Sequence, residues 1–449
     1  MSPSNPGVAG ALATTMSGGA VARGPARSWG VRGCLIALGL LVLLAVGARV
    51  IALVQLGVAE GDDFTAYWDG ARAVAAGHSP YEWLRENRPL EISDYHYAPL
   101  LAVLLAPLTP LLTYEAARWL WLLFSVGCLA AALVVIWRTS GLRLDRARPA
   151  AALPFVILLP AMVSALGTGK VSPQLLLLIA AAYALLADER AVAAGGAFAL
   201  VAYLKSFPGL LVGYLLLRRR WRALAATVVS GLVLLGLTLL VLGWEPHWAY
   251  LTGVVPAQRR WFGMPLDISL NGFWTRLLIP NLFTTPLLNA DLLGLALIAL
   301  TSAAVLAATA WAIWRAPADA RSQGLCFALA VAAMLLVTPI NGHYNLIIAA
   351  LPLAVLAADV QRTWPRGLRG LLVVLLFLSL PVEPCDLAPL RDWCLAAPSG
   401  ALADDLVWRQ GWGTLLISGP LFGLVLLWAL LFLRCRALGS EGSPARADS

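Results

Sequence analysis

Charged residues are scarce in this sequence. Asp, Glu, Lys and Arg make up 12% of the 449 residues, whereas hydrophobic residues make up 60% and the mean hydropathy is +0.80. A chain this apolar is not a soluble globular protein. Its apolar runs recur about every 20–30 residues and are continuous, not alternating, which excludes a transmembrane β-barrel. The sequence therefore predicts an all-α protein, a polytopic transmembrane helical bundle.

Signatures of nucleotide and zinc chemistry are also absent. The sequence has no Walker-type phosphate loop, no Gly-x-Gly-x-x-Gly after a strand and no His-Glu-x-x-His. The segments on the predicted inner side are too short for a nucleotide-binding domain. His78 and His96 are too isolated to suggest a metal site. We therefore expect no metal or cofactor, and a donor substrate that is already in the membrane or outside it.

The net charge of +8 follows the membrane topology. Arginines gather in short segments between apolar runs, as the positive-inside rule requires. No basic stripe is interleaved with aromatic residues, so nucleic-acid binding is excluded. The arginine clusters are Arg138, Arg143, Arg146 and Arg148; Arg218, Arg219, Arg220 and Arg222; and Arg362, Arg366 and Arg369.

The apolar runs predict about twelve membrane spans. With the N-terminus inside, basic residues predominate in the inner segments and acidic residues in the outer ones, which places both termini in the cytoplasm of a plasma-membrane protein. We expect residues 1–30 to be a disordered cytoplasmic segment, 31–436 a single transmembrane domain and 437–449 a cytoplasmic tail. The predicted spans are 33–56, 114–137, 150–166, 173–187, 191–204, 205–217, 223–243, 287–313, 323–338, 345–358, 368–382 and 412–433. Residues 191–217 are short for two crossings, and Pro208 predicts a broken helix there.

Three long segments fall on the predicted outer side: 57–113, 244–286 and 383–411. In the first, apolar residues at i, i+3, i+4 and i+7 from Phe64 predict an amphipathic helix along the membrane interface. The apolar stretch Pro99–Leu112 is too short to span and is expected to be interfacial or re-entrant. In the third segment, Cys385 and Cys394 are equally compatible with a disulfide and with two free thiols.

Two adjacent carboxylates, Asp62 and Asp63, stand where the first apolar run ends. A carboxylate at the membrane surface can deprotonate a sugar hydroxyl as a general base. Asp is also a favoured helix N-cap, and the helical pattern begins at Phe64. Catalysis and capping are compatible, because a cap position fixes the carboxylate.

Four cations on the predicted outer side are candidates for binding a lipid phosphate. Lys205 lies among apolar residues and Lys170 lies in a tight turn, where each can act as a point charge. Snorkelling to the interface is the alternative for both, and a functional role is favoured for Lys205 while both interpretations stay open for Lys170. Arg259 and Arg260 stand where the positive-inside rule disfavours cations, and Arg pairs suit bidentate phosphate contact.

Other polar and aromatic groups lie at membrane edges. Tyr95 and Tyr97 can stack on a sugar, although an interfacial aromatic belt explains any single one more simply. Asn271 can bond a sugar or form a turn with Gly272. His343 can donate to a leaving phosphate or help the base, or it can cap a helix end.

Several short motifs occur in a fixed order between about residue 60 and residue 355. They are Asp63-Phe64-x-x-Tyr67, Gly77-x-x-Pro80-Tyr81, Tyr97-Ala98-Pro99-Leu100 with Pro107-Leu108, Gly169-x-x-x-x-Gln174, Lys205-x-x-Pro208, Ser269-x-Asn271-Gly272 with Arg276, and His343-Tyr344. Together they resemble glycosyltransferase family 87, whose best-understood members are polyprenyl-phosphate-mannose-dependent mannosyltransferases. The family usually has Pro where this chain has Ala98, and Gln or Asn where it has Lys170.

The resemblance implies a fold and a reaction. The fold is a membrane bundle of the GT-C type with extracytoplasmic interfacial helices. The reaction is inverting transfer of a hexose, with mannose expected, from a polyprenyl-phosphate donor to a lipid or glycan acceptor on the extracytoplasmic face, with Asp63 as base and His343 assisting. The expected contacts with the donor phosphate are Lys205, Lys170, Arg259 and Arg260, and those with sugar or acceptor are Asp62, Tyr67, Tyr95, Tyr97, Gln174, Asn271 and Arg276.

Two other classes of function are compatible with the sequence. A multi-span transporter or lipid-sugar flippase also has many spans and broken helices, but it should place ionisable groups near the bilayer midplane and show paired halves. In this chain the acids concentrate in the outer segments and the halves differ. A non-catalytic assembly subunit of a cell-envelope machine is the third possibility. A transferase should instead bring Asp63, Lys205 and His343 to one cavity.

Overall fold

The computed structural model describes residues 43–59, 62–86, 90, 94–142, 158–265, 267–363, 374 and 412–441. By its contacts the chain divides into Met1–Ala48 and Arg49–Ser449, and the helices below belong to the second unit. Within the described ranges every regular element is a helix, and the one β-type contact is an isolated bridge between Asp267 and Gly342. The prediction of an all-α protein is confirmed. Cys385, Cys394 and most of the predicted span 368–382 lie outside the described residues.

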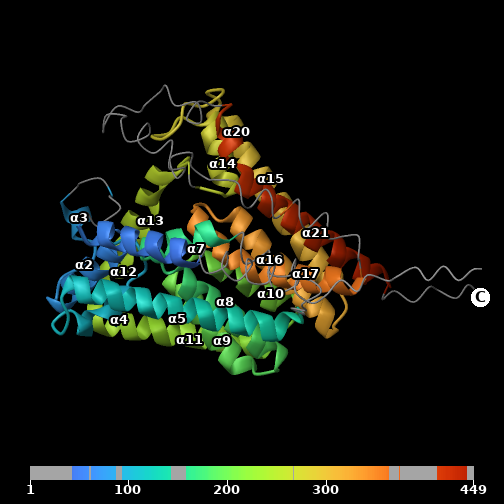
Figure 1. Cartoon of the computed structure of the whole chain (residues 1–449), viewed down its shortest axis with the longest axis horizontal. Coiled ribbons are helices and arrows are strands. Elements are labelled where there is room, and N and C mark those ends of the chain that lie inside the picture. Colours follow the sequence, from blue (N-terminus) through green and yellow to red (C-terminus); the bar gives the residue numbers. More distant parts are fainter. Residues whose placement is uncertain are drawn as a thin grey trace, which may run out of the picture. The chain divides into compact units, whose positions relative to one another are not determined.

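Six helices are long and apolar enough to cross a membrane (Figure 1). They are α5 (Tyr114–Ser140), α11 (Trp221–Leu242), α15 (Asp291–Arg315), α16 (Ala320–Val337), the continuous pair η6 (His343–Ala349) and α17 (Ala350–Thr363), and α21 (Gly419–Glu441). The number rises to eight if each of two bent helix pairs forms one span. The described part of the chain thus contains six to eight membrane-capable helices, against about twelve expected from apolar runs.

The remaining predicted spans are shorter or broken. Helices α7 (Leu159–Gly167) and α8 (Ser172–Ala187) meet at an angle of 118°, and Gly169 supplies the left-handed backbone of the turn between them. Helix α9 (Ala191–Leu204) ends at Lys205, whose backbone is extended, before η3 (Phe207–Leu211) and α10 (Val212–Leu217). The predicted break near Pro208 is confirmed, because α9 ends before this residue. The physical cause of the break is that proline cannot continue the hydrogen-bonded ladder of a helix.

The first predicted outer segment forms short helices. Helix α2 (Asp63–Ala75) buries the apolar face that begins at Phe64 and exposes Asp69 and Arg72, as its periodicity predicts. The stretch 99–112 forms only α4 (Leu100–Leu105) and η1 (Ala106–Leu108). The other short elements are α3 (Glu82–Arg85), α12 (Glu245–Ala249), η4 (Tyr250–Val254), α13 (Val255–Ala257), η5 (Gln258–Trp261), α14 (Leu270–Leu278) and α20 (Thr414–Ile417).

The long helices differ in how far neighbouring helices cover them. In the apolar window of α16, 83% of residues are buried, and in that of η6 and α17 the share is 94%. In α11 and α15 the share is only 11%. A helix that is apolar and uncovered must face lipid, whereas one that is apolar and covered forms the core. Helices α16 and α17 therefore form the centre, and α11 and α15 form the lipid-facing edge.

Side-chain contacts divide the loops into two groups, which we name the site end and the basic end. The site end is joined by the pairs Tyr97–Asp63, Lys170–Asp63, Gln258–His96, Asn271–Pro339 and Ser172–Asn345. The basic end is joined by the pairs Arg220–Glu189, Arg218–Pro317, Arg220–Gln323, Arg321–Asp359 and Arg434–Asp359. The first group coincides with segments predicted as outer and the second with segments predicted as inner. Helix α5 alone, with 27 residues, spans about 40 Å at 1.5 Å per residue.

Gly195 tests the packing of α9 against α11. A Cβ atom there would lie 2.6 Å from the carbonyl oxygen of Ala223 and 2.8 Å from the backbone nitrogen of Thr227, which cannot move aside as a side chain can. Gly195→Ala should therefore lower the free energy of unfolding by about 1–3 kcal/mol, measured by thermal unfolding in detergent. The matched control is Gly196→Ala, where the nearest atom would lie 3.9 Å away. Equal stability of the two variants would contradict this packing.

Candidate functional site

Asp62 is the N-cap residue of α2. Its Oδ1 accepts hydrogen bonds from the backbone nitrogens of Phe64 (2.8 Å) and Thr65 (3.2 Å), and the Thr65 hydroxyl accepts one from the nitrogen of Asp62. This is a reciprocal capping arrangement. The Oδ2 of Asp62 lies 2.8 Å from Nε of Arg118. Both carboxylate oxygens are thus occupied, one by a helix terminus and the other by a guanidinium.

Arg118 fixes the turn between α7 and α8. Its side chain has no exposed surface, and its Nη2 donates to the carbonyl oxygen of Gly167 at 2.6 Å. One helical turn further along α5, the Nε1 of Trp121 donates to the carbonyl oxygen of Gly169 at 2.8 Å. A buried guanidinium is stable only where acceptors surround it. The same helix therefore positions both the N-terminus of α2 and the turn that carries Lys170.

Asp63 lies at the junction of these two elements. Its Oδ1 accepts a hydrogen bond from the hydroxyl of Tyr97 at 3.3 Å, and its Oδ2 forms an ion pair with Nζ of Lys170. The residue is only 4% exposed, so these two partners cover it. Unlike Asp62, it makes no helix-capping bond. Its carboxylate is held by side chains alone, which can move independently of the backbone.

The ring of Tyr344 lies beside two cations. The Nζ of Lys170 is 4.2 Å from the centre of this ring, and the Nζ of Lys205 is 5.2 Å from it. Lys205 also lies 5.9 Å from the ring of Tyr97. An aromatic face attracts a cation, so these rings hold two like charges in one region. Lys205 makes no ion pair with any described residue, and its ammonium group is available to an anion.

A cavity of about 480 Å³ opens beside this cluster. Four residues predicted from the sequence line it: Tyr97, Lys205, Arg259 and Asn271. Its apolar wall includes Leu204, Phe207, Val255 and Ile298. Asp63 and Lys170 lie behind Tyr97 and Tyr344, which separate them from the opening. The cavity combines cations, aromatic rings and an apolar wall, a typical composition for a ligand site.

The other predicted residues make structural contacts. Tyr95 donates to the carbonyl oxygen of Ala98, Gln174 donates to the hydroxyl of Ser125, and Arg276 donates to the carbonyl oxygens of Met264 and Asp267. Tyr67 is buried with its ring 4.9 Å from that of Tyr97, behind the cavity wall. Arg260 is exposed and does not line the cavity.

His343 lies next to the cavity-lining Tyr344 and forms no hydrogen bond or ion pair with Asp63. Its Nδ1 is buried without a partner among the described residues, as are Oδ1 of Asn341 and Nδ2 of Asn345. Buried polar atoms without partners are costly, so a segment with three of them has capacity for a ligand or for water. The expectation that Asp63, Lys205 and His343 share one cavity is met only by Lys205, with the other two adjacent.

Three contributors to the site were not identified from the sequence. Arg118 could have been found, because a charge inside the long apolar run 114–137 is unusual. Tyr344 enters the sequence prediction only as part of a motif. His96 is isolated from other histidines in the sequence, yet its ring centre lies 4.3 Å from that of Tyr97 and 4.8 Å from that of Trp261. No local signal predicts the contact with Trp261, since Trp261 is far from His96 in the chain.

Comparison with known proteins gives a match to one family. The sequence profile of glycosyltransferase family 87 matches residues 95–339, more than half of the chain. The matched region contains Tyr97, Lys170, Lys205, Arg259 and Asn271, whereas Asp63 and His343 lie outside it. Neither curated proteins nor solved structures give a significant match.

His96 should make stability depend on pH. Burial, with a contribution from Lys170 and Lys205, lowers the pKa of its imidazole from 6.5 to about 4, while Asp63 acts in the opposite direction. As the pH falls from about 6.5 to 4, the unfolded chain binds a proton that the folded chain does not, so stability is lost across this window by up to about 3 kcal/mol. Thermal unfolding at pH values of about 7.5 and 5 should show a smaller difference for His96→Gln. His78→Gln, on the exposed His78, should retain the wild-type difference.

Proposed function

The chain belongs to glycosyltransferase family 87, and from this premise we propose that it transfers a hexose from a polyprenyl-phosphate donor to a lipid or glycan acceptor. The observation that carries the proposal is the carboxylate of Asp63, paired with Lys170, directly behind a cavity lined by Lys205 and Arg259. A carboxylate beside cations can separate the two tasks of glycosyl transfer, which are proton removal and charge neutralisation. Mannose is the expected hexose.

The cavity matches the chemistry of the proposed donor. Lys205 offers an unpaired ammonium and Arg259 a guanidinium for the phosphate, and Lys170 contacts the same Tyr344 ring as Lys205. The apolar wall, including Phe207 and Ile298, suits the polyprenyl chain. Asn271, whose Nδ2 donates to the carbonyl oxygen of Pro339, has its Oδ1 free for a sugar hydroxyl.

The reaction requires Asp63 to be released from its ion pair. A donor phosphate bound at Lys205 attracts the ammonium of Lys170 and competes with Asp63 for it. The freed carboxylate then accepts the proton of the acceptor hydroxyl as that oxygen attacks the anomeric carbon. The bond between the anomeric carbon and the phosphate oxygen breaks on the opposite face, which inverts the configuration. The departing phosphate is neutralised by Lys205 and Arg259, so donor binding and base activation are coupled.

Asp62 and His343 have supporting roles in this scheme. The carboxylate of Asp62, held by Arg118, contributes a negative potential that favours the positive charge developing on the sugar ring. The unpartnered Nδ1 of His343 can donate to the leaving phosphate or to the acceptor. The remaining proposals concern the whole chain: a GT-C-type bundle of about twelve spans in the plasma membrane, with both termini cytoplasmic and the site end extracytoplasmic.

A transporter or flippase is less well supported. Such proteins place their binding sites near the bilayer midplane. Here Asp63, Lys170 and Lys205 stand at or beside ends of α2, α8 and α9 that border segments predicted as outer. The proposed position at the extracytoplasmic surface suits an acceptor that arrives from the aqueous side.

Substitution of Asp63 tests the general base. Asp63→Asn keeps the shape of the side chain but cannot accept the proton, so transfer should fall by roughly 10²–10⁴-fold. The assay is transfer of radiolabelled sugar from defined polyprenyl-phosphate sugars by the purified chain. Asp69→Asn, on the exposed face of the same helix, is the matched control and should keep wild-type activity. Full activity of Asp63→Asn would contradict the assignment of Asp63 as the general base.

Substitution of Lys205 tests the donor site. Lys205→Met keeps the apolar stem but removes the charge, and a charge-assisted phosphate contact is worth about 1.5–3 kcal/mol. The kcat/KM for the donor should therefore fall roughly 10–150-fold, through a higher KM and a lower kcat, because Lys205 contacts the phosphate both before and during its departure. Arg260→Gln should change it little, since Arg260 does not line the cavity. An unchanged KM in Lys205→Met would show that the donor phosphate binds elsewhere.

A further inference from the structure

Two tight turns lie together at the basic end, far from the proposed catalytic site. One is residues 188–190, between α8 and α9, and the other is residues 218–220, between α10 and α11. Each turn contains one non-glycine residue in the left-handed region, Glu189 (φ 57°) and Arg219 (φ 53°). This backbone conformation closes each helix abruptly and allows the next to begin within three residues. The side chains of the second turn and its neighbours are consequently crowded into a small region.

Two of the four arginines between residues 218 and 222 are fully engaged. Arg218 donates to the carbonyl oxygens of Ala316 (2.8 Å) and Pro317 (2.7 Å), just beyond the end of α15. Arg220 forms two hydrogen bonds with the carboxylate of Glu189, at 3.0 and 3.1 Å, and a third with Gln323. Glu189 is thereby neutralised. These contacts hold the two turns in place.

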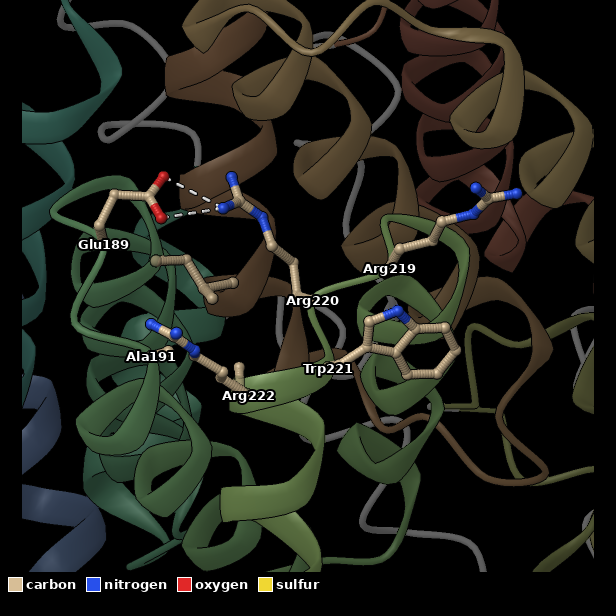
Figure 2. A pocket seen from close by; sticks show the side chains of 8 residues that line it. Glu189, Ala191, Arg219, Arg220, Trp221 and Arg222 are labelled. Carbon is tan, nitrogen blue, oxygen red and sulfur yellow. Dashed lines mark hydrogen bonds and ion pairs between the residues drawn. The ribbon is translucent and has the colours of Figure 1, made fainter.

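The other two arginines, Arg219 and Arg222, form no hydrogen bond or ion pair with any described residue. Arg219 lines two adjoining cavities of about 360 and 640 Å³, which share Glu189, Arg219 and Arg220, and Arg222 lines the smaller one. Figure 2 shows the side chains of Arg222 and Arg219 pointing in opposite directions, with the ring of Trp221 below Arg219. The region therefore carries excess positive charge, with two guanidinium groups available to an anion.

The surroundings identify the anion as a lipid headgroup. Trp221 and Trp314, which line the two cavities, are 59% and 66% exposed, as aromatic residues at a membrane interface are. Helix α11, which begins at Trp221, is the least covered of the spanning helices together with α15. An acyl chain could continue along this apolar surface from a headgroup held at the arginines. Neither feature would serve a soluble anion or an acidic peptide.

We propose that this region binds the phosphate of an anionic phospholipid, with Arg219 and Arg222 supplying the positive charge and Trp221 and Trp314 flanking it. Glu189 and Arg220, paired with each other, line both cavities, so the positive charge that remains comes from Arg219 and Arg222. Basic pockets between helices at a membrane surface hold acidic headgroups by this combination of charge and interfacial packing. The site does not involve any residue of the proposed transfer reaction.

Native mass spectrometry of the full chain in detergent can test the site. Phosphatidylglycerol and phosphatidylcholine are titrated separately, and the dissociation constants are compared. The wild type should prefer phosphatidylglycerol, and the Arg219→Gln/Arg222→Gln double variant should bind it roughly 10–30-fold more weakly. The single variants Arg219→Gln and Arg222→Gln should lie between the two and remain informative if the double variant is unstable.

Two controls make the result decisive. Arg138→Gln removes an exposed arginine at the end of α5, outside both cavities, and should keep the wild-type preference. Inorganic phosphate at the same concentrations should not displace the lipid. The proposal is overturned if the double variant retains the preference, if Arg138→Gln loses it equally, or if inorganic phosphate competes as well as phosphatidylglycerol.

Discussion

The buried ion pair between Asp62 and Arg118 is the constraint on which the site depends. Its removal would leave a guanidinium or a carboxylate without a partner in an apolar interior, which costs several kcal/mol. The pair joins the N-terminus of α2 to α5, and the same guanidinium binds the carbonyl oxygen that ends α7. Three elements are thus fixed at one point. Asp63 and Lys170, which follow directly from two of them, are brought together as a consequence.

This arrangement separates two adjacent carboxylates into different environments. Asp62 is saturated by backbone donors and a guanidinium, whereas Asp63 is held by a phenol and an ammonium that can reorient. A group saturated by fixed partners supplies a constant potential, and one with mobile partners can exchange protons during a reaction. The two acids differ because Asp62 is the N-cap of α2 and Asp63 is the first residue of the helix. This also explains how a helix cap and the proposed general base can be neighbours.

The sequence predicted the local structure better than the site. Period and length predicted α2, α5, α9 and α11 closely, because apolar runs, Gly77 and Pro208 act within a few residues. Arg118, the ion-pair partner of Asp62, lies 56 residues away, and Gln258 and Tyr344, which contact His96 and Lys205, are further still. These contacts depend on tertiary packing that no local pattern encodes. The prediction of about twelve spans counts every apolar run of the sequence as one membrane crossing. It could not distinguish a straight helix from the 118° bend between α7 and α8.

The two left-handed turn residues have a consequence for how this chain balances foldability against chemistry. Glycine would adopt the backbone of Glu189 and Arg219 without steric conflict, whereas a side chain in this conformation costs about 1–2 kcal/mol. The chain thus accepts strain at two neighbouring corners and places opposite charges at them. Replacing either corner with glycine would relax the backbone while erasing its charge. At these two positions a substitution that relieves backbone strain also removes a charge. A more stable variant at Arg219 would therefore be less selective for an anionic ligand.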